Sequence, residues 1–350
     1  MKVAVVGAGV VGLSTTAALL AAGVDVVCYE RAAAVMGERS AGSSRIFRLA
    51  HADPDLVALA RLARDGFGRW STQAGRSMVD AQGCVVSGGD AADRATAMSA
   101  AGAPYELVDA GSAQLRVPAA VSASPVLVDP EGGVVDVDAV RAFLVARAGR
   151  AVVHEPVHDL ETDDRGAIVR GPTGARRVDA VVLAAGAGTS ALAARVGIAT
   201  PSALVHHARF TFPVDEPPGV RRQAWIDTPA ADRGLATYQH RSGPARWSVG
   251  GSIDPALVAW EVGRDAAVEA SREVVLAYAR ERLAVVPRVV ETLYCTHVPD
   301  VGDGITFSRS GSVLAVDGEN LMKFAPVLGE TLAAAAVSGA TPAVRELVAR

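Results

Sequence analysis

The chain has 350 residues, of which 50% are hydrophobic and 21% charged, and this composition indicates a compact globular protein with a large buried core. The net charge of −4 is spread along the chain and excludes the basic stripe that is typical of nucleic-acid-binding proteins. Small molecules are therefore the expected partners.

The three cysteines, Cys28, Cys84 and Cys295, stand far apart and form neither a C-x-x-C pair nor a cluster with histidines. We therefore expect no disulfide framework, no metal site and a reducing compartment. Glycines interrupt the apolar N-terminal run, which argues against a secretory signal, and no uncharged apolar stretch has the length of a membrane span. These features predict a cytoplasmic protein without a membrane partner.

The first thirty residues predict a strand, a helix and a second strand. Residues 3–6 are suited to a strand buried on both faces, and residues 13–22 are apolar at helix-compatible spacing. Gly23 ends this helix, and residues 24–30 ("VDVVCYE") predict a second buried strand. The segment therefore reads as a βαβ unit.

Gly7, Gly9 and Gly12 form a G-x-G-x-x-G motif between the first strand and the helix, and Glu30 ends the second strand about twenty residues later. The three glycines permit the tight turn, the approach of a pyrophosphate and close helix–strand packing. The helix N-terminus, at Val10 and Val11, offers free N–H groups to phosphates. Glu30 can accept hydrogen bonds from a ribose. The alternative is a glycine-rich turn with an incidental acid.

The βα repeats of an NAD dehydrogenase do not follow. Residues 32–51 form a loop with small polar residues and arginines, residues 54–70 predict a helix, and short strands begin near residue 83. The nucleotide-binding pattern resumes with a helix over 137–149, short strands near Val153, and a buried strand over 180–184 that ends in the small-residue turn 185–188.

This order is that of glutathione-reductase-type FAD domains, so FAD is favoured over NAD. We predict an α/β chain in which a Rossmann FAD-binding domain is interleaved with an α+β, mixed-sheet substrate domain. The predicted FAD-binding domain comprises residues 1–50, 135–205 and 293–350, and the predicted substrate-binding domain comprises residues 51–134 and 206–292.

Over nearly its whole length the chain resembles the D-amino acid oxidase superfamily of FAD-dependent oxidoreductases, in particular the branch of monomeric sarcosine oxidase and N-methyltryptophan oxidase. The resemblance is carried by the glycine motif, "GSSRIFRLAH" at 42–51, "VVLAAGAGTSAL" at 181–192, "CTHVPDVGDGITF" at 295–307 and the segment around Lys323. "GSSRIFR" is the most specific of these motifs.

The resemblance implies that Arg45 lies near the flavin and that Arg48 binds a substrate carboxylate, for which a planar guanidinium is well suited. Lys323, one of only two lysines, would lie near the flavin and the same carboxylate. The alternatives are one solvated face of arginines and a surface lysine. The cofactor-binding residues expected from motif and resemblance are Gly7, Gly9, Val10, Val11, Gly12, Glu30, Arg31, Ser43, Ser44, Arg45, Val153, Ala185, Gly186, Gly318, Asn320, Leu321, Met322 and Lys323.

The chain departs from the family where some members attach FAD to a cysteine. Aligning Pro299 and Asp300 with the family's Pro-Asp pair puts Leu293 at that position, and Cys295 lies two residues on, about 7 Å along a strand. We therefore expect non-covalent FAD, with a bond to Cys295 as the alternative.

The family's oxygen-activating lysine corresponds to Ser248, or to Arg246 in a shifted register, and the family's histidine a turn later falls near Ser252. Loss of a positive charge there casts doubt on fast oxidase activity. Tyr238, His240 and Trp247 are candidates for the pocket wall, with His240 a possible acid or base. Trp225 and Trp247 also suit the core, and His206 and His207 should face opposite sides of a strand, which disfavours a shared metal.

The expected activity is oxidation of a small amine or imino acid carrying a carboxylate, by hydride transfer to flavin N5, with O₂ as the favoured acceptor. The candidate catalytic residues are Arg48, Lys323, Ser248, Tyr238 and His240. The alternatives are a flavin dehydrogenase with another electron acceptor and a flavin-binding subunit without turnover.

Overall fold

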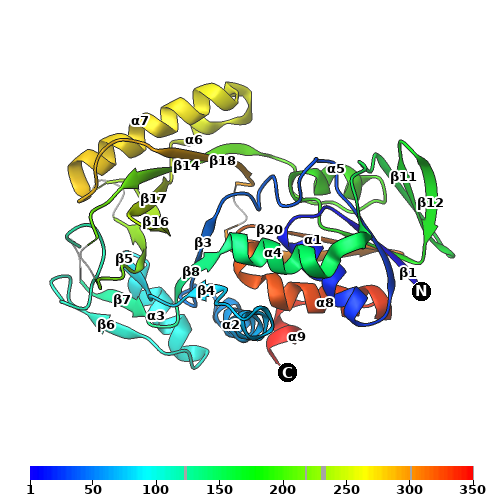
Figure 1. The fold of residues 1–350 in the computed structure, drawn as a ribbon, viewed down its shortest axis with the longest axis horizontal. Helices are drawn as coiled ribbons and strands as arrows, with labels where there is room; N and C mark the ends of the chain where they lie inside the picture. Colours follow the sequence, from blue (N-terminus) through cyan, green and yellow to red (C-terminus); the bar gives the residue numbers. More distant parts are fainter. Residues whose placement is uncertain (122–123, 217–218, 230–233, 300–301, 350) are drawn as a thin grey trace.

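The computed structural model describes residues 1–350 except 122–123, 217–218, 230–233, 300–301 and 350. The chain is a mixed α/β protein built around two large sheets (Figure 1). The first sheet has the strand order β19-β20-β13-β1-β2-β9, and its neighbours are parallel except for β19 and β20. Its strands are β1 (Lys2–Val6), β2 (Asp25–Tyr29), β9 (Val152–Val153), β13 (Ala180–Leu183), β19 (Ile305–Ser310) and β20 (Val313–Gly318).

Both faces of this sheet are covered, as its continuous apolar strands predict. Val3 and Val5 pack into the core that contains the helices, whereas Ala4 and Val6 pack into a second core on the opposite face. The helices of the first layer, α1 (Val10–Ala21), α4 (Val137–Ala148) and α8 (Ala325–Ser338), lie together in the right half of Figure 1. The other face carries β10 (Asp159–Asp163), β11 (Gly166–Gly171), β12 (Gly174–Val178) and α5 (Thr189–Ala194), with the short turns η1 (Gly149–Ala151) and η2 (Gly186–Gly188) nearby in the chain.

The predicted strands over 3–6, 24–30 and 180–184 and the helix over 137–149 are confirmed. The helix predicted from residue 13 begins three residues earlier, because Gly9 takes the extended backbone of a helix N-cap and lets Val10 start the first turn. The cavity described below therefore meets the helix N-terminus directly.

The second sheet has eight strands in the order β18-β14-β17-β16-β15-β5-β7-β6, mostly antiparallel. Helix α7 (Arg264–Arg282) covers one face of it at the upper left of Figure 1, over a core that includes Phe210, Trp225 and Trp247. The strands and adjoining elements are β18 (Glu291–His297), β14 (Val205–Pro213), β17 (Arg246–Gly251), β16 (Thr237–Gly243), β15 (Ala224–Thr228), β5 (Cys84–Gly88), β7 (Val126–Asp129), β6 (Glu106–Val108), α3 (Ala91–Ala100), α6 (Pro255–Val258) and η3 (Trp260–Val262).

A small sheet joins the two bodies. Its strand β3 (Ser44–Phe47) pairs with β8 (Gly133–Asp136), which pairs with β4 (Val79–Asp80), and β3 also contacts β16 of the large sheet and η4 (Leu321–Phe324). Helices α2 (Pro54–Ala74) and α9 (Val344–Val348) pack together beside this region. The segment of Arg45 and Arg48 thus lies between the two large sheets.

The predicted division into two domains stays a prediction. Three elements cross its boundaries: β8 spans the boundary at 134–135, β14 spans the boundary at 205–206, and β18 spans the boundary at 292–293. Both β14 and β18 belong to the eight-stranded sheet.

One helical stretch among the described residues, 321–338, has the length and apolar composition to span a membrane, and 61% of it is buried inside the protein. This burial is that of a helix packed in a protein core, where it contacts α1 and α2.

Candidate functional site

A cavity of about 1030 Å³ runs from the glycine turn after β1 to the segment around Lys323, between the first sheet and one face of the eight-stranded sheet. Most of the predicted site residues line it. These are Gly7, Gly9, Val10, Val11, Glu30, Arg31, Arg45, Arg48, Ala185, Gly186, Tyr238, His240, Gly318, Asn320, Leu321, Met322 and Lys323. Five predicted residues do not line it: Gly12, Ser43, Ser44, Val153 and Ser248.

The glycine turn leaves no room for side chains. Gly7 has φ +101°, and a Cβ there would lie 2.5 Å from the carbonyl oxygen of Ala184. A Cβ at Gly12 would lie 1.8 Å from the carbonyl oxygen of Gly7, so Gly12 provides the close helix–strand contact and not a cavity wall. Val10 N–H donates to Ser40 Oγ at 3.1 Å, and the N–H groups of this first helical turn have no acceptor inside the helix. The turn therefore fits a phosphate-bearing cofactor.

Glu30 is 9% exposed and borders the cavity at the end of β2. Its carboxylate accepts from Ala8 N–H at 2.8 Å and from Ala32 N–H at 2.9 Å. A carboxylate offers about four lone-pair sites, so acceptor capacity remains for a ribose hydroxyl. Glu30 both holds the glycine turn and fits the sugar of a dinucleotide.

Val153 pairs with Tyr29 in the sheet, and the residues after it face the cavity instead: Glu155, Val157 and His158. Val153 itself does not line the cavity, because β9 ends at that residue and the loop beyond it reaches the cavity.

Arg48 and Lys323 are buried in the same cavity wall, 9% and 3% exposed. The alternatives of a solvated arginine face and a surface lysine are therefore wrong for these two residues. Both contact Asp303, a residue that the sequence analysis did not identify. Arg48 Nη2 donates to Asp303 Oδ2, and Lys323 Nζ lies 3.5 Å from Asp303 Oδ1.

Two further side chains hold the Asp303 carboxylate: His51 Nδ1 lies 2.9 Å from Oδ2, and Asn320 Nδ2 donates to Oδ1 at 2.8 Å. Burial opposes the charge of Asp303, but Arg48 and Lys323 outweigh this penalty and keep the pKa of its carboxyl well below the usual range. Burial and the neighbouring Arg48 lower the pKa of Lys323 to about 7. The site therefore holds one or two positive charges and one negative charge near neutral pH.

The cavity-facing side of the eight-stranded sheet carries a second polar group. Arg209 on β14 donates from Nη1 to the carbonyl oxygen of Ser44 at 3.0 Å and lies 3.1 Å from His240 Nε2. Arg45 donates to the same carbonyl at 2.9 Å. His240 is 1% exposed, and burial together with Arg209 lowers its pKa well below the usual value. His240 is therefore neutral, and it is buried in the cavity wall.

His207 and Tyr238 form a stacked pair on the same face, with His207 Nε2 2.5 Å from the Tyr238 hydroxyl. Burial and His297 lower the pKa of His207 to about 4, and burial raises the pKa of Tyr238. Both side chains are therefore neutral at pH 7 and can exchange hydrogen bonds with a ligand. The neighbouring Cys295 is a free thiol that lines the cavity, and burial raises its pKa as well.

Two expectations for this sheet need correction. Ser248 is fully buried and bonds to Thr211 Oγ1 at 2.8 Å, so its hydroxyl is satisfied within the sheet and does not line the cavity. Trp247 faces the opposite side, where its indole N–H donates to Gln239 Oε1 at 2.8 Å, so it is a core residue and not part of the pocket wall. Alternation along β17 explains the placement of Trp247.

The expectations for Trp225 and for the separation of His206 from His207 are met. Trp225 is a core residue, and its indole N–H donates to Ser87 Oγ. His206 and His207 contact different partners, since His206 stacks on Trp260 and bonds to Tyr294. Within the described parts of the chain, no group of three or more His, Cys, Asp or Glu side chains could hold a metal.

Near the Pro-Asp pair used for alignment, Leu293, Cys295 and Pro299 line the cavity, whereas Asp300 lies outside the described residues. Arg246 is exposed at the end of β17 and does not reach the cavity, so the shifted register offers no cation either. Ser252 does line the cavity.

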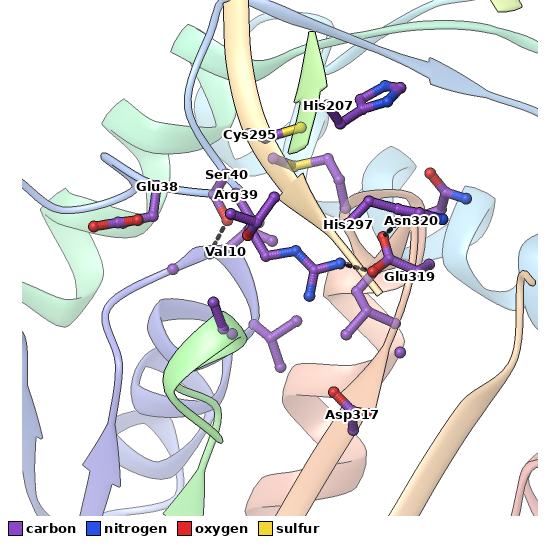
Figure 2. A pocket seen from close by; sticks show the side chains of 18 of the residues that line it. Val10, Glu38, Arg39, Ser40, His207, Cys295, His297, Asp317, Glu319 and Asn320 are labelled. Atoms are coloured by element: carbon purple, nitrogen blue, oxygen red, sulfur yellow. Dashed lines mark hydrogen bonds and ion pairs between the residues drawn. The ribbon is translucent and has the colours of Figure 1, made fainter. Parts of the chain in front are cut away.

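A further ion pair lies among the side chains that line the cavity (Figure 2). Arg39, from the loop after β2, donates to Glu319, whose other oxygen lies 3.1 Å from His297 Nδ1. Glu319 also accepts from the backbone N–H of Val298 at 2.9 Å. Arg39, Glu319, Asp303 and Arg209 were not predicted as site residues, and His207 was considered only as a disfavoured metal ligand. The one available signal was the alternation of His207, Arg209 and Thr211 along β14, where the intervening residues Ala208, Phe210 and Phe212 are apolar.

Comparison with protein-family models matches residues 2–335 to the family described as FAD dependent oxidoreductase, DAO. No curated protein matches the chain by sequence. The open form of NikD, an unusual amino acid oxidase essential for nikkomycin biosynthesis, has a TM-score of 0.83 at 21% identity, covering 99% of this chain and 96% of that chain. L-proline dehydrogenase from P. horikoshii has a TM-score of 0.75 at 16% identity, covering 97% of this chain and 93% of that chain. Glycine oxidase from Geobacillus kaustophilus has a TM-score of 0.74 at 18% identity, covering 98% of this chain and 96% of that chain.

Proposed function

The chain belongs to the DAO family of FAD-dependent oxidoreductases, and from this premise we propose that it oxidises a small amine or imino acid that carries a carboxylate. The observation that carries the proposal is the burial of Arg48 and Lys323 in the cavity that also contains the glycine turn. The names of the structural neighbours, which include an amino acid oxidase, a proline dehydrogenase and an iminodiacetate oxidase, support this substrate class.

The residues that would hold FAD are distributed along the cavity. The glycine turn and the N-terminus of α1 would take the pyrophosphate, and Glu30 would take the adenosine ribose. When bound, FAD supplies the hydride acceptor for the oxidation. No sulfur link is required by this arrangement, and we propose that the cofactor is bound non-covalently.

Arg48 and Lys323 would bind the substrate carboxylate by competition with Asp303. In the protein alone, Asp303 already supplies an anion to both cations. A substrate carboxylate can bind Arg48 and Lys323 only by weakening their contacts with Asp303, and this cost reduces its net binding free energy. We therefore expect binding of moderate strength. Because Lys323 is buried beside a second cation, an added anion would raise its pKa and draw in a proton.

His207 and Tyr238 would serve the nitrogen end of the substrate. A hydride leaves the carbon next to an amine only when that nitrogen is neutral, so a protonated substrate has to lose a proton. The neutral imidazole of His207 has an acceptor lone pair, and the phenol of Tyr238 is its bonding partner. This pair can accept a hydrogen bond from the substrate N–H without placing a further cation in the cavity.

Oxygen is the proposed acceptor, with H₂O₂ as the product. Two rivals remain: a dehydrogenase that passes electrons to another acceptor, and a flavin-binding subunit without turnover. The absence of a lysine at position 248 supports the first rival.

The test is an anaerobic screen of the purified FAD-containing protein against N-methyl, cyclic and D-amino acids, monitored by the flavin absorbance. Bleaching by a carboxylate-bearing amine, and its loss for the matched amine without the carboxylate, is expected. Peroxide formation on admission of air separates an oxidase from a dehydrogenase. If no candidate bleaches the flavin, the proposed substrate class is wrong.

A further inference from the structure

The cations that line the cavity differ in how they are neutralised. Arg39 is paired with Glu319, and Arg48 and Lys323 share Asp303. Arg45 and Arg209 have no carboxylate partner in the part of the chain that the structure describes; their hydrogen bonds go to backbone carbonyls and to His240. The uncompensated positive charge of the cavity is therefore concentrated at these two guanidinium groups.

Arg209 is 4% exposed, and burial together with Arg45 lowers its pKa to about 10, so it remains charged at neutral pH. Among the described residues, Arg209 Nε has no hydrogen-bond partner. The adjoining His240 accepts from Arg209 through Nε2, because a guanidinium has no acceptor. The ring proton of His240 is then on Nδ1, which is also buried without a partner in the described part of the chain. Two buried donors, Arg209 Nε and His240 Nδ1, thus lack an acceptor from the described residues.

Burying a charge without a counter-ion is unfavourable, because the charge loses its hydration. A fold tolerates such a cost at a site where negative charge arises during function. In the proposed reaction the C–H bond next to the neutral amine nitrogen would break, the amine would become an iminium, and bound FAD would take up the hydride together with one negative charge. O₂ would then take two electrons and one proton from the cofactor and a second proton from solvent to form H₂O₂. Negative charge therefore develops twice in a cavity that Arg209 lines.

The position of Arg209 gives it a specific role. In the sheet, Thr211 pairs with Ser248 and Arg209 pairs with Gly250, so Arg209 projects from the same face as Ser248, one residue pair away. We propose that Arg209, supported by Arg45, is the cation that stabilises the reduced flavin and the oxygen that it reduces. This inference rests on the proposed function. It places on β14 the positive charge that the family resemblance led us to expect at position 248 or 246 on β17.

The test compares Arg209→Met and Arg209→Lys with the matched control Arg246→Met. Arg246 lies on the neighbouring strand, is more than half exposed and takes no part in the cavity. Each FAD-containing variant is reduced with dithionite and mixed rapidly with O₂, which needs no knowledge of the substrate. Reoxidation should slow by about tenfold or more in Arg209→Met, recover largely in Arg209→Lys, and be unchanged in Arg246→Met.

Sulfite provides a readout other than turnover, because its addition to oxidised flavin leaves negative charge on the ring. The dissociation constant for sulfite should rise about tenfold or more in Arg209→Met and recover in Arg209→Lys. If both the reoxidation rate and the sulfite affinity of Arg209→Met match those of the parent protein, the proposal is wrong. It is equally wrong if Arg209→Met weakens only the binding of substrate, because Arg209 would then hold the substrate carboxylate.

If Arg209→Met does not fold, Arg209→Lys still decides the question. A buried lysine loses its proton as the pH rises, so reoxidation of this variant should slow with rising pH more steeply than in the parent protein. Identical pH profiles would contradict the proposal. If no candidate amine bleaches the flavin but the reoxidation and sulfite experiments give the expected results, the proposed substrate class is refuted and the role of Arg209 stands.

Discussion

Lys323 shows how burial converts a permanent charge into a titrating one. Its pKa is lowered to about 7 by burial and by Arg48, so the ammonium is charged below this pH and increasingly neutral above it. An anionic ligand binds the charged form. We therefore expect the affinity for acetate, measured from the flavin absorbance, to be constant below about pH 7 and to fall above it, by up to about tenfold per pH unit.

The control for this pH dependence is Lys323→Met, in which acetate should bind weakly and with the same affinity from about pH 6 to about pH 9. A parent protein whose affinity does not change across this range would show that Lys323 does not titrate where its surroundings indicate.

Asp303 competes with any ligand carboxylate, and its removal separates binding from stability. Asp303→Asn removes the negative charge and keeps most of the shape. Acetate should bind about tenfold more tightly, which corresponds to ~1.4 kcal/mol. The free energy of unfolding, measured by urea denaturation, should fall by about 3 kcal/mol because two buried cations lose their partner. Unchanged acetate binding would mean that the ligand does not use Arg48 and Lys323.

At the scale of elements, glycines allow neighbouring helices to pack very close to one another. Helix α2 contains two glycines, Gly66 and Gly68, that differ in this respect. A Cβ at Gly66 would lie 2.5 Å from Pro326 Cβ on α8, whereas a Cβ at Gly68 would meet nothing within 4 Å.

We expect Gly66→Ala to lower the free energy of unfolding by about 2 kcal/mol, because α2 and α8 have to move apart. Gly68→Ala should raise it by roughly 0.5 to 1 kcal/mol, because alanine is the better helix former at an exposed position. Urea denaturation of both variants measures the difference. Equal effects would show that α2 and α8 are not packed at the distance seen here.

At the scale of the whole molecule, the cavity lies between two sheets that are built from interleaved segments of the chain. A ligand that contacts both sheets binds only the folded protein and stabilises it by mass action. Addition of FAD to the apoprotein at about 100 times its Kd should therefore raise Tm by about 4 °C.

After denaturation with acid, the flavin should remain in the supernatant, as expected for non-covalent binding, and Cys295→Ser should bind FAD as the parent does. Yellow colour retained by the precipitated protein, and lost in Cys295→Ser, would establish a covalent link instead.

The local patterns of the sequence were sufficient for the βαβ unit and the glycine turn, and most of the site residues predicted from motif and resemblance border the cavity. The βαβ unit depends on neighbours along the chain: valine runs define buried strands, and Gly12 is required by its contact with Gly7 in the same short unit. The family resemblance located Arg45, Arg48 and Lys323 in the same way, through short motifs that contain them.

Charge pairing could not be predicted, because it depends on segments that are distant in the chain. Asp303 reaches Arg48 across 255 positions, and Arg209 meets Ser44 across 165. The positions of Ser248 and Trp247 could not be predicted for the same reason. Which face of β17 is turned toward the cavity depends on the strands that pair with it in the sheet.

By itself, therefore, the sequence determined that this protein folds around a dinucleotide and which short motifs meet it. Only the tertiary structure decided that Asp303 neutralises one pair of cations and that Arg45 and Arg209 have no carboxylate partner among the residues that the structure describes. The physical reason is that covalent neighbours determine backbone conformation, whereas electrostatic balance in a cavity depends on which distant side chains the packed sheets bring within a few ångströms.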